Sequence, residues 1–257
     1  MVAFMNKALP PEKLLQWFVT AGADESIGDD PVNRFAPPEV SSVAAVRSGG
    51  VPATPETARI VALPRAASLE ELKRLLADFD RSPLKATATN MVFGSGNLQA
   101  DLMIIGEAPG AEEDRQGLPF VGASGRLLDL MLKSVGLNRD DVYITNILPW
   151  RPPGNRKPSE DEVALFAPFV RQHIALVKPK ILLLLGGSAA AALMNTSAGI
   201  TKTRGRWMTY ADEGISVPAM ASFHPAFLLR SPAQKKQAWR DFLAVRQKLS
   251  DTEKAET

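Results

Sequence analysis

Side chains capable of acid–base or recognition chemistry follow three apolar runs of this sequence. Glu107, Glu113 and the isolated ring of Phe120 follow the first run, and Asn146 and Asn155 follow the second. Carboxylates exchange protons, amides read the donor and acceptor pattern of a polar ring, and an aromatic side chain stacks on such a ring. If these segments meet, their residue types suit a pocket for a small polar ring.

The third segment carries His224 and then Leu228, Leu229 and Arg230. An imidazole can donate a hydrogen bond to developing negative charge. Plainer explanations exist for each candidate, because a strand-end Asn is commonly a cap, a His before Pro is commonly structural, and loop glutamates are commonly solvated. Phe120 could simply fill the core. The hypothesis of a site depends on all three segments lying on one rim.

A parallel sheet is the element expected to position these segments. Because strand patterns alternate with helical ones, we predict an α/β fold with helices on both faces of the sheet. In such sheets ligands bind at the carboxyl ends of the strands. A long glycine-rich loop with an acidic run at 112–114 is expected after the first strand. The predicted strands are 102–105, 142–146, 180–185, 207–210 and 217–222, and the main predicted helices are 11–23, 68–79, 159–177, 188–194 and 233–249.

Composition narrows the class of protein. The 257 residues are 45% hydrophobic, which is enough for one substantial core. The absence of cysteine excludes disulfides, thiolate metal sites and cysteine nucleophiles, and two histidines are too few for a histidine-rich metal site. The net charge of +2 and pI of about 8.9 permit nucleic-acid binding without arguing for it.

The organisation along the chain is expected to be an N-terminal helix within 1–28, a Pro/Ala-rich linker or arm at 29–67, one domain at 68–250 and a charged tail at 251–257. We find neither an apolar run long enough to span a membrane nor the apolar core of a signal peptide, so we expect a cytoplasmic protein. We also expect a monomer. A phosphate-binding loop is disfavoured, since GEAPG lacks the following Lys-Ser/Thr pair and the acidic run would repel a pyrophosphate.

Three longer segments resemble a known family. GEAPGAEEDRQGLPFVGASGRLLD, ITNILPWRPPGNRKPS and HPAFLLRSP are similar, in this order, to the signature segments of family 4 uracil-DNA glycosylases. The resemblance covers about residues 97–249. It implies the superfamily's three-layer sandwich with a central four-stranded parallel sheet. It also implies a hydrolase of base excision repair that flips uracil out of DNA and cleaves its N-glycosidic bond.

The resemblance also implies roles in the pocket. Phe120 would stack on the flipped uracil, Asn146 would read N3 and O4, and His224 would hydrogen-bond O2 of the departing base. Asn155 would support the uracil-binding loop. Water would be positioned by Glu107 and the backbone of Ala108, where some branches carry a catalytic Asp. The remaining implied roles are pocket shape or water assistance for Glu113, wedging into the duplex for Leu228 and Leu229, and a phosphate contact for Arg230.

One departure from the family concerns its iron–sulfur cluster, which four cysteines hold. The corresponding positions here are Phe79, Ser82, Trp150 and Phe166, which cannot ligate such a cluster. We therefore expect no cofactor and no metal, with the three aromatic residues filling the volume as a small core. The alternative function is a catalytically weak nucleic-acid-binding module that keeps the fold.

Overall fold

The structure, a computed structural model, describes residues 64–212 and 214–255, which lie in the larger of two units, Ile60–Thr257. The predicted helix at 11–23 and most of the 29–67 segment lie outside the described residues, so the boundaries expected there remain predictions. No helix in the described ranges is long and apolar enough to cross a membrane.

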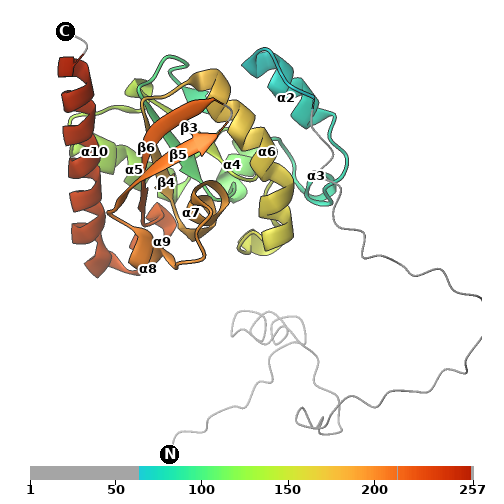
Figure 1. Cartoon of the computed structure of the whole chain (residues 1–257). Coiled ribbons are helices and arrows are strands. Elements are labelled where there is room, and N and C mark those ends of the chain that lie inside the picture. Colours follow the sequence, from blue (N-terminus) through green and yellow to red (C-terminus); the bar gives the residue numbers. More distant parts are fainter. Residues whose placement is uncertain (1–63, 213, 256–257) are drawn as a thin grey trace, which may run out of the picture. The chain divides into compact units, whose positions relative to one another are not determined.

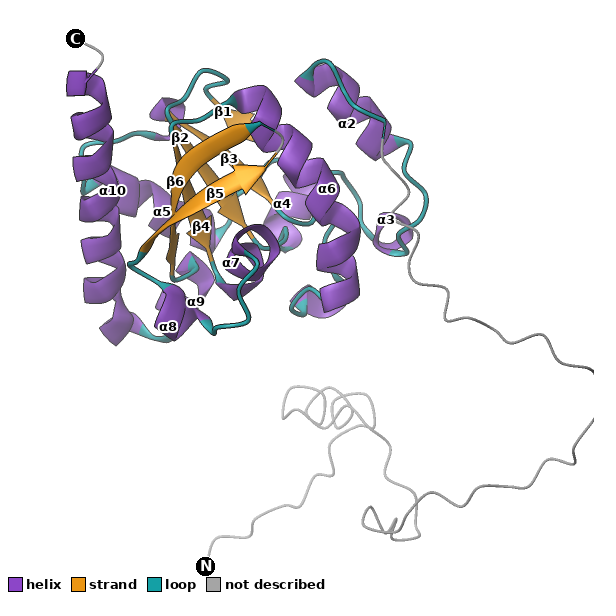
Figure 2. Ribbon diagram, viewed as in Figure 1, coloured by secondary structure: helices purple, strands orange, loops and turns teal. Residues whose placement is uncertain are grey.

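One mixed sheet organises the described residues (Figures 1 and 2), with strand order β1-β3-β2-β4-β6-β5. Its inner strands pair in parallel, while β1 and β5 pair antiparallel with β3 and β6. The four inner strands β3, β2, β4 and β6 form a parallel sheet, and the two edge strands, whose antiparallel pairing was not expected, make the whole a six-stranded mixed sheet. The short link between β5 and β6 makes this pair antiparallel, since a parallel partner needs a long crossover. The strands are β1 (Ser95–Gly96), β2 (Leu102–Gly106), β3 (Val142–Asn146), β4 (Ile181–Leu185), β5 (Trp207–Asp212) and β6 (Ile215–Ser222).

Alternate residues of the inner strands serve two separate cores. Met103 and Ile105 join the core that contains Phe166, whereas Leu102 and Ile104 join the core on the other face. All residues of β2, β3 and β4 are buried, as the apolar run at 180–185 predicts for a strand covered on both faces. The sheet is therefore the middle layer of three, and its carboxyl edge is the place where polar side chains emerge.

The helices cover both faces of the sheet (Figure 2), with α6 and α7 over one face and α5 and α10 over the other. Two predicted caps are confirmed, because Ser68 and Ser159 accept hydrogen bonds from the amides of Glu71 and Glu162. The helices are α2 (Leu69–Ala77), α3 (Leu84–Thr87), α4 (Ala111–Gln116), α5 (Ala123–Lys133), α6 (Glu160–Val177), α7 (Gly187–Met194), α8 (Ile200–Thr203), α9 (Pro225–Arg230) and α10 (Lys235–Ala255). The last one continues into the segment expected to be a tail.

The connection from β2 to α5 is not the continuous loop that its glycines suggest. It contains α4, which begins after Gly110 and ends at Gly117, whose φ of 71° lies in the left-handed region. Gly117 ends the helix there because glycine adopts this conformation without strain. The acidic run falls in the first turn of α4, where carboxylates interact favourably with the helix dipole.

Candidate active site

A buried amide and an aromatic ring meet at the carboxyl end of the sheet. Asn146 ends β3 and pairs with Gly106, the last residue of β2. A side chain at Gly106 would clash with both Asn146 Oδ1 and the Phe120 ring, so glycine is what allows these two groups to approach. Asn146 is 5% exposed, and its Oδ1 lacks a hydrogen-bond partner among the described residues. Such an unmet acceptor is costly in a folded protein and marks a place prepared for a ligand donor.

Phe120 is held in an unusual backbone conformation. Its φ is 54°, in the left-handed region that a bulky residue rarely adopts, and its side chain is 4% exposed. The carboxylate of Glu113 holds the residues that follow, because its Oε1 accepts from the amides of Val121 (2.9 Å) and Gly122 (2.8 Å). Its Oε2 accepts from the amide of Gly110 at 3.1 Å. Glu113 therefore acts on the backbone of the Phe120 loop.

Arg139, which was not among the predicted site residues, holds the same loop through the carbonyl oxygens of its main chain. Its guanidinium donates to the carbonyl oxygens of Phe120 (2.8 Å) and Pro119, and it pairs with Asp129 at 3.1 Å. A carboxylate on the amides and a guanidinium on the carbonyls thus fix Phe120 between opposite charges. Nothing in the sequence distinguishes Arg139 from an ordinary loop arginine, because its partners are main-chain atoms about twenty residues away.

His224 stands beside Phe120 with a defined tautomer. Its Nδ1 accepts a hydrogen bond from the amide of Ala226 (3.1 Å), capping α9. Since an accepting nitrogen carries no proton, the neutral ring has its proton on Nε2. Its ring stacks on Phe120, with centroids 5.4 Å apart and planes at 30°. His224 can therefore offer one N–H donor beside the pocket.

The electrostatic surroundings favour the neutral form of His224. Burial is the main cause that lowers the pKa of His224, and the positive charge of Arg230 acts in the same direction. The negative charges of Glu107 and Glu113 act against this shift but do not overcome it. A neutral imidazole at neutral pH can donate from Nε2 without adding a full positive charge to the pocket.

Glu107 is docked on the start of α7. Its Oε1 accepts from the amide of Ser188 at 2.8 Å. A side chain at Gly186, whose φ is 108°, would clash with the Glu107 carboxyl group, so glycine is required there by both space and conformation. Ala108 follows, partly buried against the core, and brings no ionisable group. Glu107 is therefore a fixed carboxylate at the rim of the sheet.

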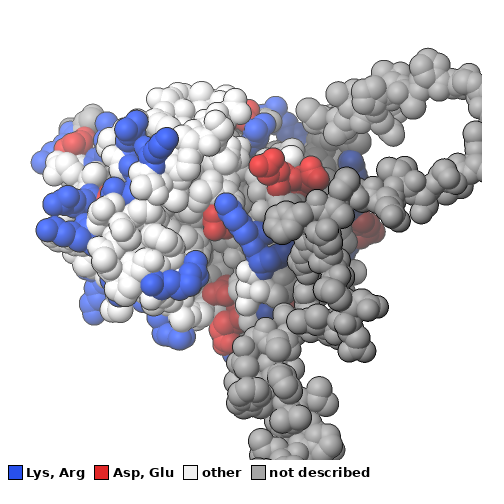
Figure 3. Space-filling view, turned by 90° about the horizontal axis from the view of Figure 1, so that it is seen from below, with Lys and Arg blue, Asp and Glu red and all other residues white. Residues whose placement is uncertain are grey.

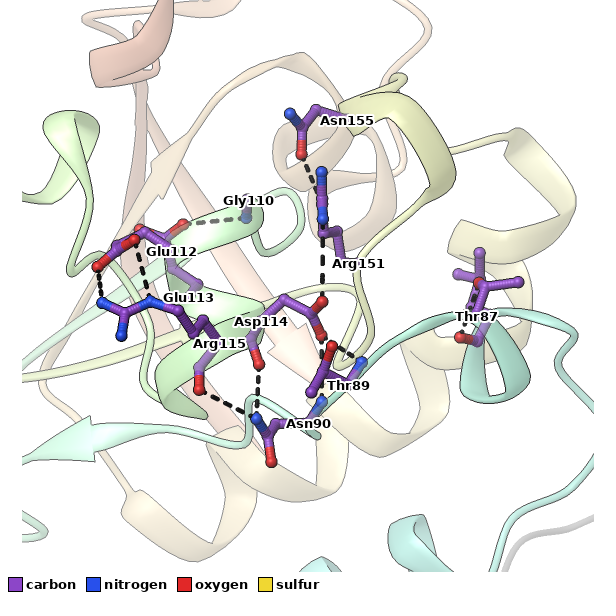
Figure 4. Close-up of polar contacts among 11 residues, drawn as sticks. Thr87, Thr89, Asn90, Gly110, Glu112, Glu113, Asp114, Arg115, Arg151 and Asn155 are labelled. Atoms are coloured by element: carbon purple, nitrogen blue, oxygen red, sulfur yellow. Dashed lines mark hydrogen bonds and ion pairs between the residues drawn. The ribbon is translucent and has the colours of Figure 1, made fainter.

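Asn155 lies in a different polar network (Figure 4). It is exposed, and its Oδ1 accepts from Arg151 Nε at 2.8 Å. Arg151 also pairs with Asp114 at 3.9 Å, and Asp114 in turn accepts from the amides of Thr89 and Asn90. This network ties the loop after β3 to α4 and to the segment before β1. Among the described residues, no contact brings the Asn155 side chain onto Asn146 or Phe120.

The two leucines expected to enter DNA together have different environments. Leu228 is fully buried in a small cluster with Phe223 and Ala238, whereas Leu229 is 44% exposed. In the free protein Leu229 faces solvent, whereas the Leu228 side chain lies on the face of α9 that packs on the core. That both leucines wedge into the duplex stays a prediction. Leu229 and Arg230 are the exposed pair.

Three of the four positions that correspond to cluster ligands, Phe79, Trp150 and Phe166, form an aromatic cluster together with Phe169. Ring centroids lie 5.9 Å apart for Phe79 and Phe166 and 5.6 Å apart for Trp150 and Phe166, in edge-to-face geometry. The hydroxyl of Ser82 instead accepts from the amide of Leu84. These contacts leave the four positions unfit for an iron–sulfur cluster. Within the described ranges, no group of three or more His, Cys, Asp or Glu side chains is placed to hold a metal ion.

Comparisons with known proteins identify the family of this chain. The family described as the uracil DNA glycosylase superfamily matches residues 93–243. The chain is 37% identical to a type-4 uracil-DNA glycosylase of Sulfurisphaera tokodaii, over 70% of this chain and 84% of that protein. The matches to type-4 enzymes of Pyrobaculum aerophilum and Archaeoglobus fulgidus are 38% and 37% identical, over 67% and 69% of this chain and 90% and 92% of those proteins. The chain therefore belongs to the uracil-DNA glycosylase superfamily, as its motifs predicted.

Proposed function

We propose that this protein is a uracil-DNA glycosylase that acts in base excision repair on DNA containing uracil. The observation that carries the proposal is the buried, unpartnered Oδ1 of Asn146 beside the ring of Phe120. Its type-4 relatives bear the name of this activity. Monomeric state and cytoplasmic location remain predictions from the sequence.

Base recognition follows from the chemistry of the Asn146 amide. The free Oδ1 accepts from N3–H of uracil, and the amide NH₂ donates to O4. Cytosine presents the opposite pattern, an acceptor at N3 and a donor at N4, so it would leave the buried groups of the pocket unpaired. Selectivity for uracil thus rests on the Asn146 side chain, whose Oδ1 acceptor has no partner among the described residues of the free protein.

Bond cleavage requires stabilisation of the departing base. As the N-glycosidic bond breaks, the sugar gains oxocarbenium character and uracil leaves as an anion with charge on O2. The Nε2–H of His224 donates to that oxygen, and the hydrogen bond strengthens as the charge grows. Because the pKa of His224 is lowered, the ring is neutral at neutral pH, and its single proton lies on Nε2, since Nδ1 accepts from Ala226.

The attacking water is positioned rather than strongly deprotonated. Glu107 is held at the rim by Ser188, and we assign its carboxylate and the backbone at Ala108 to the water. Glu113 is engaged with three backbone amides, so we assign it to holding Phe120 in place. No step of this mechanism uses a bound metal.

Base entry requires the pocket to open. In the free protein the His224 ring stacks on Phe120, with centroids 5.4 Å apart, so it covers a face on which a base would stack. Phe120 is only 4% exposed, so neither of its faces is open to a base. We infer that the Phe120 and His224 rings separate when the nucleotide flips in.

The test is the release of free uracil from defined single- and double-stranded oligonucleotides under single-turnover conditions. Wild-type protein should release uracil and leave cytosine intact. Asn146→Asp should release uracil far more slowly, because a carboxylate lacks the donor for O4 and adds charge beside a departing anion. Asn195→Asp, the same change at an exposed residue that ends α7, is the matched control and should keep the wild-type rate. DNA binding without base release would favour the nucleic-acid-binding module.

A further inference from the structure

A basic surface is formed by α8, the connection from α8 to β5 and the start of α10. Between residues 200 and 240 the sequence contains two acidic residues, Asp212 and Glu213. Lys and Arg side chains gather on the α10 side of the face shown in Figure 3. Five exposed cations form this surface: Lys202, Arg206, Lys235, Lys236 and Arg240.

A buried ion pair joins the α8–β5 connection to α10 and leaves the charges of the five exposed cations unneutralised. Arg204 donates to the carbonyl of Gln237 at 2.9 Å and pairs with Asp241, which is 3% exposed. Ser222 also donates to Asp241 at 2.7 Å. The carboxylate of Asp241 is therefore buried and already paired with Arg204. The same contacts fix the α8–β5 connection against α10.

An exposed tryptophan lies within the basic surface. Trp239 is 48% exposed on the second turn of α10. The preceding residue, Ala238, packs with Leu228 in one buried cluster, and the exposed Leu229 follows Leu228. Trp239 and Leu229 are thus each adjacent in sequence to a residue of the Ala238–Leu228 contact between α10 and α9, and His224 caps α9. The start of α10 therefore packs against α9, the helix whose N-terminus carries His224 of the candidate active site.

We propose that the basic surface binds an unpaired stretch of the DNA strand next to the flipped nucleotide, with phosphates on Lys235, Lys236 and Arg240 and one base stacked on Trp239. Cations bind the backbone of any strand, and an exposed indole offers a stacking face that a paired base within a duplex cannot use. The proposal rests on the proposed function, because the strand is placed by the nucleotide in the pocket. It assigns to this surface a preference for single-stranded over duplex DNA.

The experiment measures the affinity of the full chain for single-stranded and duplex oligonucleotides that carry a stable abasic-site analogue, over a range of salt concentrations. Trp239→Ala should weaken single-strand binding roughly 5- to 150-fold, the range expected for one lost stacking contact, and duplex binding much less. The double change Lys235→Gln and Lys236→Gln should reduce the salt slope on single strands by about 1.4, for two lost phosphate contacts. Lys248→Gln with Lys254→Gln, exposed lysines further along α10, is the matched control and should change neither quantity.

Three results would overturn the proposal: single-strand affinity of Trp239→Ala within twofold of wild type, an unchanged salt slope for the Lys235 and Lys236 variant, or an equal effect of the control pair. Uracil release is measured on the same preparations. Wild-type protein that releases no uracil contradicts the proposed function, whereas active wild type with normally binding Trp239→Ala contradicts only the surface.

Discussion

The aromatic cluster and the pocket both contain buried phenylalanine rings, but they differ in backbone strain and in whether their polar atoms have hydrogen-bond partners. Phe166 is fully buried and contacts Phe79, Trp150 and Phe169 with ring centroids 5.6 to 6.4 Å apart. Phe120 has comparable burial, yet its backbone is left-handed and its neighbour Asn146 holds an unpaired acceptor. The aromatic cluster is a region optimised for packing, whereas the pocket retains strain and unused hydrogen-bonding capacity.

The difference indicates how this chain can lack cluster cysteines while keeping the site. The aromatic cluster joins α6 to the segment after α2 by dry packing, which stabilises the fold without ligand chemistry. The pocket depends on charged side chains that hold main-chain atoms, Glu113 and Arg139 above all. Substitutions in the two regions should therefore affect different measurements.

The largest expected effect is on stability, at the aromatic cluster. Phe166→Ala should lower the free energy of unfolding by about 3–5 kcal/mol, because it removes a fully buried ring and leaves a cavity. Chemical denaturation monitors this loss. The rate of uracil release per folded molecule should stay near wild type. A similar loss of rate in folded protein would show that the two regions are not independent.

The next effect is on catalysis, at His224. His224→Asn should lower the single-turnover rate about a hundredfold, close to 2.7 kcal/mol, since a donor to the departing base is lost. Asn remains a good N-cap and can still accept from the amide of Ala226, so the melting temperature should change little. A slow rate accompanied by equal loss of stability would instead make His224 a structural cap of α9.

Phe120 provides the direct counterpart of Phe166. Phe120→Ala should weaken productive base binding by about 1–3 kcal/mol through lost stacking. Its effect on unfolding should be smaller than that of Phe166→Ala, because a bulky residue is strained in the left-handed region and its replacement by the smaller alanine relieves part of that strain. Rates measured over a range of enzyme concentrations separate binding from cleavage. Equal destabilisation by the two substitutions would remove the contrast between the regions.

The smallest effect is the pH dependence of stability due to His173, on the aromatic-cluster side of the sheet. Its Nε2 lies 2.8 Å from the hydroxyl of Tyr143, its ring stacks on Phe93, and burial lowers its pKa to about 3. The unfolded chain takes up a proton below pH 6.5 but the folded one does not, so stability falls as the pH drops from 6.5 towards 3.

At pH 5.5 this loss amounts to about 1.4 kcal/mol. His173→Gln, which cannot titrate but can still bond Tyr143, should remove this component of the pH dependence. Denaturant midpoints at pH 7.5 and 5.5 for both proteins measure it. The same slope in both would assign the pH dependence to other groups.

Much of the architecture followed from local sequence. The apolar run at 180–185 predicted the buried strand observed at 181–185, and Ser68 and Ser159 predicted the starts of α2 and α6. These features depend on residues within a few positions of one another, so sequence patterns report them. The three loops at the carboxyl edge were also predicted, because the direction of parallel strands places their ends together.

The tertiary structure alone decided which of the candidates meet and in what state. It paired Asn146 with Gly106 and left its acceptor free, clamped Phe120 through Arg139, and placed Asn155 in a separate network. It also buried Leu228 while exposing Leu229. These outcomes depend on main-chain atoms and packed faces brought together from distant parts of the chain. Sequence spacing reports only a side chain's local surroundings, whereas burial and hydrogen bonding are set by neighbours that only folding supplies.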